Sequence, residues 1–196
     1  HLRGAPVADA VARDRAAVPE SIRIYRLDDV VIASHEDEWL PVFTEVFSGL
    51  NVTALLFARP TMPFADLLVA RADPGADRLM PKDSETRTFL HDIPIIRKQE
   101  WLRKPKAALA EKIIRCLRER KAVVIQELGV VAAGGVTMEQ AYIGYSTIFH
   151  TTFVKYLLDL LTEGFKLPGE REAFEAFRKT WIRPIDLDGL QFSLGP

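Results

Sequence analysis

One stretch, residues 121–161, constrains the fold more than any other part of the chain. It begins with two short apolar runs, Ala-Val-Val-Ile at residues 122–125 and Val-Val-Ala-Ala at residues 130–133. Short runs of β-branched residues are typical of buried strands. The glycine pair at residues 134–135 interrupts the second run and marks a turn. The pattern therefore predicts two adjacent strands followed by a change of direction.

A long helix is predicted directly after this turn. Thr137 and Gln140 have the spacing of a capping box, which satisfies backbone N–H groups at a helix start. Gly164 is a natural end. Between them, apolar and aromatic side chains recur at helical spacing: Met138, Tyr142, Tyr145, Phe149, Phe153, Tyr156, Leu157 and Leu160. At about 1.5 Å per residue a helix over residues 137–163 is about 40 Å long, so the other elements must pack around it.

The rest of the chain alternates strand-like and helix-like segments. Residues 22–27 and 30–33 predict a hairpin, residues 53–58 predict a further strand, residues 67–70 another short one, and residues 71–82 a loop. Strands are also expected near residues 93–97, and helices after Asp37 and over residues 83–90, 105–120 and 170–181. Because several connections resemble hairpins, the predicted fold class is α/β, with a central, mainly antiparallel sheet flanked by helices.

The length of 196 residues and the 48% content of hydrophobic residues predict a single domain with a sizeable core. We assign residues 21–184 to this domain. Residues 1–20 are expected to form a leader or a short helix, and residues 185–196 an extended C-terminal tail. Four side chains of the predicted sheet and long helix are expected in the core: Leu56, Val124, Tyr145 and Phe149.

The composition argues against several classes of partner. The chain has 26 Lys and Arg against 27 Asp and Glu, so a nucleic-acid partner is not expected. No apolar run reaches the ~18 residues of a membrane span. The single cysteine, Cys116, excludes a disulfide framework and favours a reducing, cytoplasmic compartment. Phosphate-binding loops, dinucleotide fingerprints and nucleophile elbows are absent from the sequence.

The order of motifs over residues 29–165 resembles the class II aldolase/adducin family. The similarity rests on the order of its parts. A strand leads into Leu128-Gly129-Val130, which opens a second strand that ends in glycine. Then Thr137-Met138-Glu139-Gln140-Ala141 starts a long helix. Residues 55–60, Leu-Leu-Phe-Ala-Arg-Pro, stand where the family has Val-Val-His-x-His-Pro. Glu38 matches the family's acid/base glutamate. The resemblance implies a class II aldolase-like fold and a homo-oligomer with active sites near the subunit boundaries.

The resemblance fails at the family's zinc ligands. Phe57, Arg59 and Leu128 occupy the positions of the three zinc-binding histidines. Phenylalanine and leucine offer no lone pair, and arginine is a permanent cation, whereas zinc needs neutral imidazoles. We therefore expect no metal and no other cofactor at this location. His1, His35, His91 and His150 form no closely spaced pair that could replace the lost ligands.

Three hypotheses for the function remain open. The first is a metal-free relative that works by binding, oligomerisation or regulation, for which the head domain of adducin is the family precedent. The second is a metal-independent lyase, isomerase or dehydratase that acts on a small sugar phosphate or carboxylate through Glu38 and Arg59. The third, and weakest, is a zinc-dependent sugar-phosphate aldolase whose ligands have moved to other positions.

Two charged features carry further expectations. With the ion absent, Arg59 is expected either to pair with Glu38 or to hold a small anionic ligand beside it, unless it simply turns to solvent. A buried pair of this kind predicts a loss of ~3–5 kcal/mol for Arg59→Ala. The basic stretch at residues 115–121 is explained by the solvated face of a helix, with Glu111 pairing with Arg115. The alternative is a basic patch that binds anions.

Overall fold

The structure of the chain is a computed structural model that describes residues 21–27, 30–59 and 63–181. It divides into two compact units, which meet in sequence between Gly164 and Phe165. The predicted leader, the Asp28-Asp29 turn and the C-terminal tail lie outside the described residues. Among the described helices, none has both the length and the apolar character required to cross a membrane.

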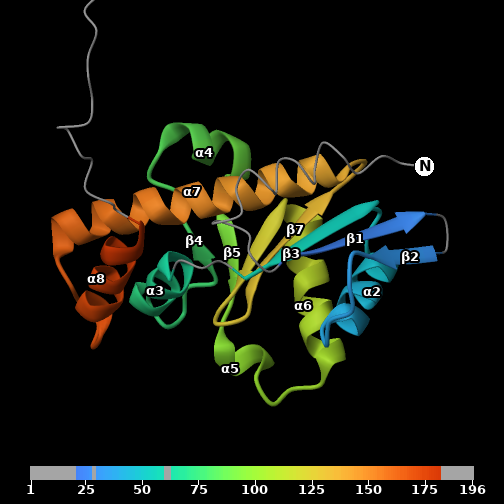
Figure 1. Cartoon of the computed structure of the whole chain (residues 1–196), viewed down its shortest axis with the longest axis horizontal. Helices are drawn as coiled ribbons and strands as arrows, with labels where there is room; N and C mark the ends of the chain where they lie inside the picture. Colours follow the sequence, from blue (N-terminus) through green and yellow to red (C-terminus); the bar gives the residue numbers. More distant parts are fainter. Residues whose placement is uncertain (1–20, 28–29, 60–62, 182–196) are drawn as a thin grey trace, which may run out of the picture. The chain divides into compact units, whose positions relative to one another are not determined.

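The first unit is built on a seven-stranded sheet of described residues in the order β2-β1-β3-β7-β6-β5-β4 (Figure 1). The strands are β1 Ser21–Leu27, β2 Val30–Ala33, β3 Ala54–Ala58, β4 Arg78–Leu79, β5 Ile93–Ile96, β6 Ala122–Ile125 and β7 Gly129–Gly134. Within the described residues β5 and β6 form the one parallel pair, and the other neighbours are antiparallel. The predicted α/β class with a mainly antiparallel sheet is confirmed.

Helices cover both faces of this sheet. They are α2 Leu40–Gly49, α3 Phe64–Arg71, α4 Ser84–Leu90, α5 Lys98–Trp101, α6 Lys106–Glu119 and α7 Met138–Glu163. The helices α2 and α6 pack together over the cluster of apolar side chains on one face, and α7 crosses the strands β3, β6 and β7 (Figure 1). All five residues of β3 are buried, because the strand is covered on both faces.

The helix α7 begins as the sequence predicted. The Thr137 hydroxyl accepts a hydrogen bond from the Gln140 N–H, and the Gln140 side chain returns to the Thr137 N–H. The helix ends at Gly164, whose φ of 71° is readily available to glycine. Leu56, Val124 and Tyr145 are buried as expected, whereas Phe149 is only half-buried.

The predicted strand at residues 67–70 is wrong. This segment belongs to the helix α3, which buries Phe64, Ala65, Leu68 and Val69 on one face. The spacing i, i+1, i+4 and i+5 is helical, and Asp66 in the first turn and Arg71 in the last turn complement the helix dipole. A short apolar run does not by itself distinguish a strand from a buried helix. The predicted loop at residues 71–82 likewise contains the short strand β4.

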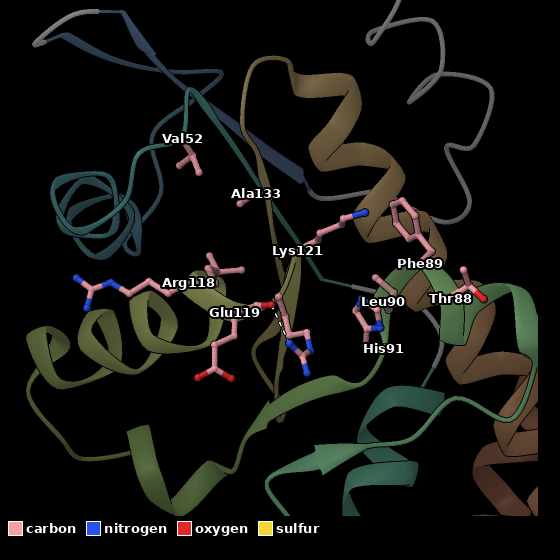
Figure 2. A pocket seen from close by; sticks show the side chains of 11 residues that line it. Val52, Thr88, Phe89, Leu90, His91, Arg118, Glu119, Lys121 and Ala133 are labelled. Atoms are coloured by element: carbon pink, nitrogen blue, oxygen red, sulfur yellow. Dashed lines mark hydrogen bonds between the residues drawn. The ribbon is translucent and has the colours of Figure 1, made fainter.

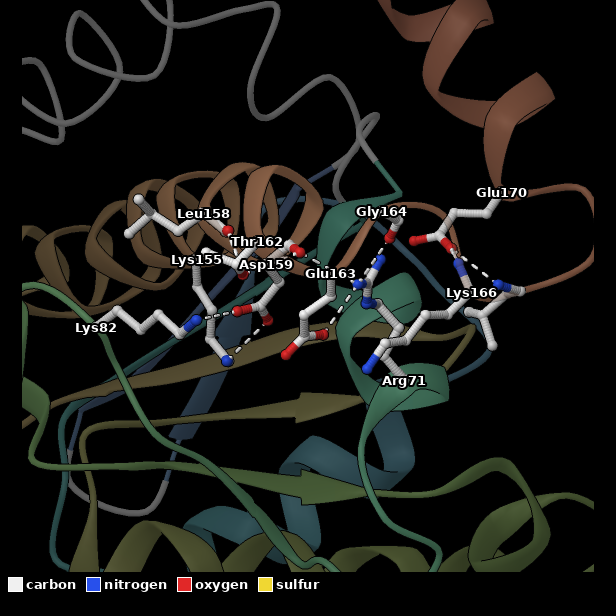
Figure 3. Close-up of polar contacts among 11 residues, drawn as sticks. Arg71, Lys82, Lys155, Leu158, Asp159, Thr162, Glu163, Gly164, Lys166 and Glu170 are labelled. Carbon is white, nitrogen blue, oxygen red and sulfur yellow. Dashed lines mark hydrogen bonds and ion pairs between the residues drawn. The ribbon is translucent and has the colours of Figure 1, made fainter.

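A buried polar cluster ties α3 to the C-terminal half of α7 (Figure 3). The Arg71 guanidinium, with a side chain only 4% exposed, donates to the Gly164 carbonyl at 3.1 Å and pairs with Glu163 at 3.2 Å. Asp159 pairs with both Lys82 and Lys155. Burial acts to raise the pKa of Asp159, but the hydrogen bonds from the two ammonium groups outweigh it and the pKa is lowered. These contacts anchor the end of the long helix.

The second unit contains the helix α8, Glu170–Trp181, with the bounds that the sequence predicted. Glu170 is buried, and its carboxylate accepts the N–H groups of Lys166 and Leu167 at 2.7 and 2.9 Å (Figure 3). Phe177 is buried, while Phe165 and Phe174 are half-buried and contact each other. The carboxylate thus fixes the backbone just before the helix, and the Phe165–Phe174 contact links this segment to the helix.

Candidate functional site

The candidate site lies where β3 ends and the chain turns from β6 into β7. Phe57 lies in β3, and Arg59 is the first residue after this strand. Leu128 lies in the turn between β6 and β7, where its N–H donates to the Ile125 carbonyl at 3.0 Å. The antiparallel register pairs Ala58 with Val130, and this pairing places the turn against the end of β3. Phe57 and Arg59 thus meet Leu128, which is far from them in the sequence, at one end of the central strands β3 and β7.

Gly129 makes this close approach possible. Its φ is +147°, and a Cβ atom at this position would lie 2.5 Å from the Ala58 carbonyl oxygen and 2.9 Å from Cε2 of Phe57. A side chain of any other type would therefore push the turn away from β3. The glycine keeps Leu128 packed beside Phe57.

The former metal-ligand positions are filled with apolar groups. Phe57 is 1% exposed and its ring centroid lies 4.9 Å from that of Phe43. Leu128 is 7% exposed and belongs to the same apolar cluster. The Arg59 guanidinium lies 5.5 Å from the Phe57 ring centroid, in the range of a cation–π contact. This packing leaves no lone pair at the positions where zinc would need one.

The carboxylate opposite Arg59 is that of Asp37, not of Glu38. The Arg59–Asp37 distance is 3.7 Å, and Asp37 also accepts the Trp39 N–H at 2.7 Å, which turns it back toward the helix α2. Glu38 is exposed, and its backbone carbonyl accepts a hydrogen bond from Lys106. The predicted Arg59–Glu38 pair is therefore wrong by one residue.

The exposure of this pair also changes its expected energy. The side chain of Arg59 is 39% exposed, so solvent screens its interaction with Asp37. A partly exposed ion pair contributes ~0–1 kcal/mol to stability rather than the ~3–5 kcal/mol of a buried pair. The larger loss on Arg59→Ala is accordingly no longer expected.

Two acidic residues that the sequence analysis missed line a small cavity with Arg59 and Leu128. Asp66 accepts the Glu127 N–H at 2.8 Å, and the cavity between them has a volume of about 100 Å³. Burial raises the pKa of Asp66, and the neighbouring Glu127 carboxylate adds to this, although the backbone hydrogen bond opposes it. Asp66 directly precedes residues 67–70, whose pattern predicted a strand, so its place in the first turn of the helix α3 was not expected; Glu127 lies in the turn before β7.

These residues do not fit a zinc ion. The three matching positions supply no donor, and no group of three His, Cys, Asp or Glu side chains in the described part of the chain could hold a metal. The cavity is also smaller than the ~300–1,000 Å³ of typical small-molecule sites. The arrangement can hold Arg59 and a protonatable carboxyl close together, but it cannot surround a sugar phosphate.

Replacing Asp66 by asparagine is expected to stabilise the protein at neutral pH. The asparagine oxygen can still accept the Glu127 N–H, while the buried charge is removed. Because the folded-state pKa of Asp66 is raised above 3.8, the folded state binds the proton more tightly than the unfolded state. The advantage of Asp66→Asn should therefore shrink as the pH falls through the raised pKa toward 3.8. Urea unfolding of both proteins across this range measures it; an unchanged difference would contradict the assignment.

Solved structures with the same fold are class II aldolases and their relatives. L-fuculose-1-phosphate aldolase from Thermus thermophilus superposes with a TM-score of 0.63 and 18% sequence identity, over 82% of this chain and 93% of that chain. YgbL from Klebsiella pneumoniae gives a TM-score of 0.61 and 11% identity, over 87% and 93%. YgbL from Escherichia coli gives a TM-score of 0.59 and 11% sequence identity, over 87% of this chain and 93% of that chain. The fold is thus that of the class II aldolases, as the sequence motifs implied.

Comparison of sequences alone adds nothing to this likeness. No family model matches the sequence, and no curated protein matches it. At these low identities the superpositions establish the fold and leave the chemistry to be argued from the residues of this chain.

Proposed function

We propose that this chain is a divergent class II aldolase-like protein without a zinc site, which acts by binding, oligomerisation or regulation rather than by catalysis. The observation that carries the proposal is the packing of Phe57 and Leu128 at the former ligand positions. Both are core side chains, so this part of the site belongs to the apolar interior. A catalytic zinc ion needs three protein ligands and an open coordination position, and this interior provides neither.

An activity assay tests the proposal against the function of the neighbours. The purified chain is incubated with L-fuculose 1-phosphate, with and without added zinc, beside the Thermus thermophilus aldolase as the positive control. We expect no cleavage in either condition, because Phe57, Arg59 and Leu128 cannot hold the zinc ion that would polarise the substrate carbonyl. Zinc-dependent cleavage by the chain at a rate comparable with that of the control would overturn the proposal.

A second candidate is a metal-independent lyase, isomerase or dehydratase. It is favoured by the shared cavity of Arg59 and Asp66, where a guanidinium could hold an anionic group and a carboxyl of raised pKa could transfer a proton. Glu38, exposed and without a contact to Arg59, supports this candidate less than Asp66 does. Turnover of a small phosphorylated or carboxylated compound that Asp66→Asn abolishes and Glu38→Gln spares would favour it over the binding role.

We also propose that the protein forms a homo-oligomer. The C-terminal aromatics do not provide the expected exposed surface, since Phe177 is buried; the Trp181 side chain and Phe192 are not described. Exposed aliphatic side chains on and before α7 support it instead: Val136, Ile143, Leu158 and Leu161. Light scattering at micromolar concentration should give at least twice the monomer mass of 22.1 kDa. A monomer would refute the assembly.

The cysteine content supports a proposal for the compartment. We propose a cytoplasmic protein, because Cys116 has no partner cysteine in the sequence. The residue is half-buried, and burial raises the pKa of its thiol, which keeps it protonated and unreactive at neutral pH.

A further inference from the structure

A larger cavity lies at the other end of the β6–β7 hairpin (Figure 2). Its volume is about 730 Å³, within the ~300–1,000 Å³ range of small-molecule sites. Lys121 precedes β6 and Ala133 lies near the end of β7, whereas Leu128 occupies the opposite turn. At ~3.3 Å per residue, the four residues of β6 separate the two ends by about 13 Å. The cavity shares no residue with the one at Arg59.

The cavity has an apolar floor. Val52, Leu90, Leu117 and Ala133 contribute aliphatic side chains from four different elements or their flanks, and Phe89 adds a ring at one side (Figure 2). Leu90 and Leu117 are buried, so the floor is continuous with the protein interior. Such a surface favours a ligand with an apolar body.

Two of the charged residues at the rim are already engaged. Arg120 donates to Asp92 at 2.9 Å, and Glu119 accepts from Arg78 at 2.8 Å. These two side chains therefore belong to an ion-pair network that joins the end of α6 to β4 and to the turn before β5.

The other two cations have no carboxylate partner among the described residues. The Lys121 ammonium lies 3.5 Å from the centroid of the Phe89 ring, and Arg118 donates to the Gly49 carbonyl at 3.3 Å. Figure 2 shows the two side chains extending to different sides of the cavity. Their charges leave an excess of positive potential over an apolar floor. Both residues belong to the basic stretch at residues 115–121, for which a solvated helix face with a Glu111–Arg115 pair was the expectation. The described residues form no such pair.

We propose that this cavity binds a small organic anion with an apolar body, whose anionic group is held by Lys121. Arg118 adds positive potential from the other side, and the floor takes the apolar body. Lys121 is already placed over Phe89, so it can hold the anion without abandoning a salt bridge. The site is independent of the zinc-free site at Phe57 and goes beyond the proposed function.

A matched pair of fluorescent probes tests the site. 8-Anilino-1-naphthalenesulfonate and N-phenyl-1-naphthylamine share the apolar body and differ in the sulfonate. We expect saturable binding of the sulfonate probe to the native chain, with a Kd that Lys121→Gln raises about five-fold and Arg118→Gln raises less. Binding of the neutral probe should not change. Arg87→Gln is the control, because Arg87 is exposed on the neighbouring helix α4 and does not line the cavity.

Several results would overturn the site. The first is the absence of saturable binding of the sulfonate probe. The second is an equal weakening of its binding by Arg87→Gln and by Lys121→Gln. The third is an equal loss of binding of both probes in Lys121→Gln. A measurement on the unmodified chain guards against a variant that does not fold. Added salt should weaken binding of the sulfonate probe but not of the neutral probe, since it screens the charge at Lys121. Salt-independent binding of the anion would also reject the proposal.

Discussion

The substitution Phe57→Ala is expected to lower the free energy of unfolding by about 3–5 kcal/mol. The ring is 1% exposed and packs on Phe43 with centroids 4.9 Å apart, so its removal leaves a cavity inside the core. The large effect follows from the central claim that this position is now structural. Urea unfolding monitored by circular dichroism measures it.

Val136→Ala is the control for this experiment. The Val136 side chain is 74% exposed, and its truncation should change the stability by less than about 0.5 kcal/mol. If Phe57→Ala were as mild as Val136→Ala, the ring would not be part of the core, and the former ligand positions would form an open site instead.

The substitution Gly129→Ala is expected to destabilise the protein by about 2–4 kcal/mol, because it combines backbone strain with a steric clash. The φ of +147° is unfavourable for alanine, and the added Cβ would meet the backbone oxygen of Ala58 at 2.5 Å. Relief of the clash requires movement of the turn that carries Leu128 away from β3. The same denaturant titration measures the loss.

Gly75→Ala tests whether this effect is specific. No atom lies within 4 Å of a Cβ at Gly75, and its φ lies outside the positive region, so the change should be nearly neutral. Equal losses at Gly75 and Gly129 would mean that the tight approach of the turn to β3 does not stabilise the fold.

The central hairpin and the long helix were predictable because several local signals agree. The β-branched runs mark the strands, the glycine pair marks the turn after them, and the capping box at Thr137 marks the start of the helix. The bounds of β6 and α7 agree closely with these signals. The segment that became α3 lacked such agreement. Its run Leu67-Leu68-Val69-Ala70 satisfies a strand pattern, and the packing of Phe64 on the Phe153 and Tyr156 rings of α7 selects the helix.

The candidate site was predictable in position but not in its pairing. The motif order predicted where Phe57, Arg59 and Leu128 would lie, and the strand register then places β3 beside the turn before β7. The choice of Asp37 over Glu38 as the partner of Arg59 depends on a backbone turn in which Asp37 accepts the Trp39 N–H. Consecutive carboxylates offer no sequence signal that separates them, and the burial of Asp66 depends on tertiary packing.

The most direct measurement is the zinc content of the purified chain. The protein is equilibrated with excess zinc, separated from free metal by gel filtration and analysed by mass spectrometry of the element. Because Phe57, Arg59 and Leu128 provide no zinc donor, the account predicts far less than one ion per chain and no change in thermal stability on adding zinc. Recovery of one tightly held zinc ion per chain, with a matching rise in the melting temperature, would contradict it.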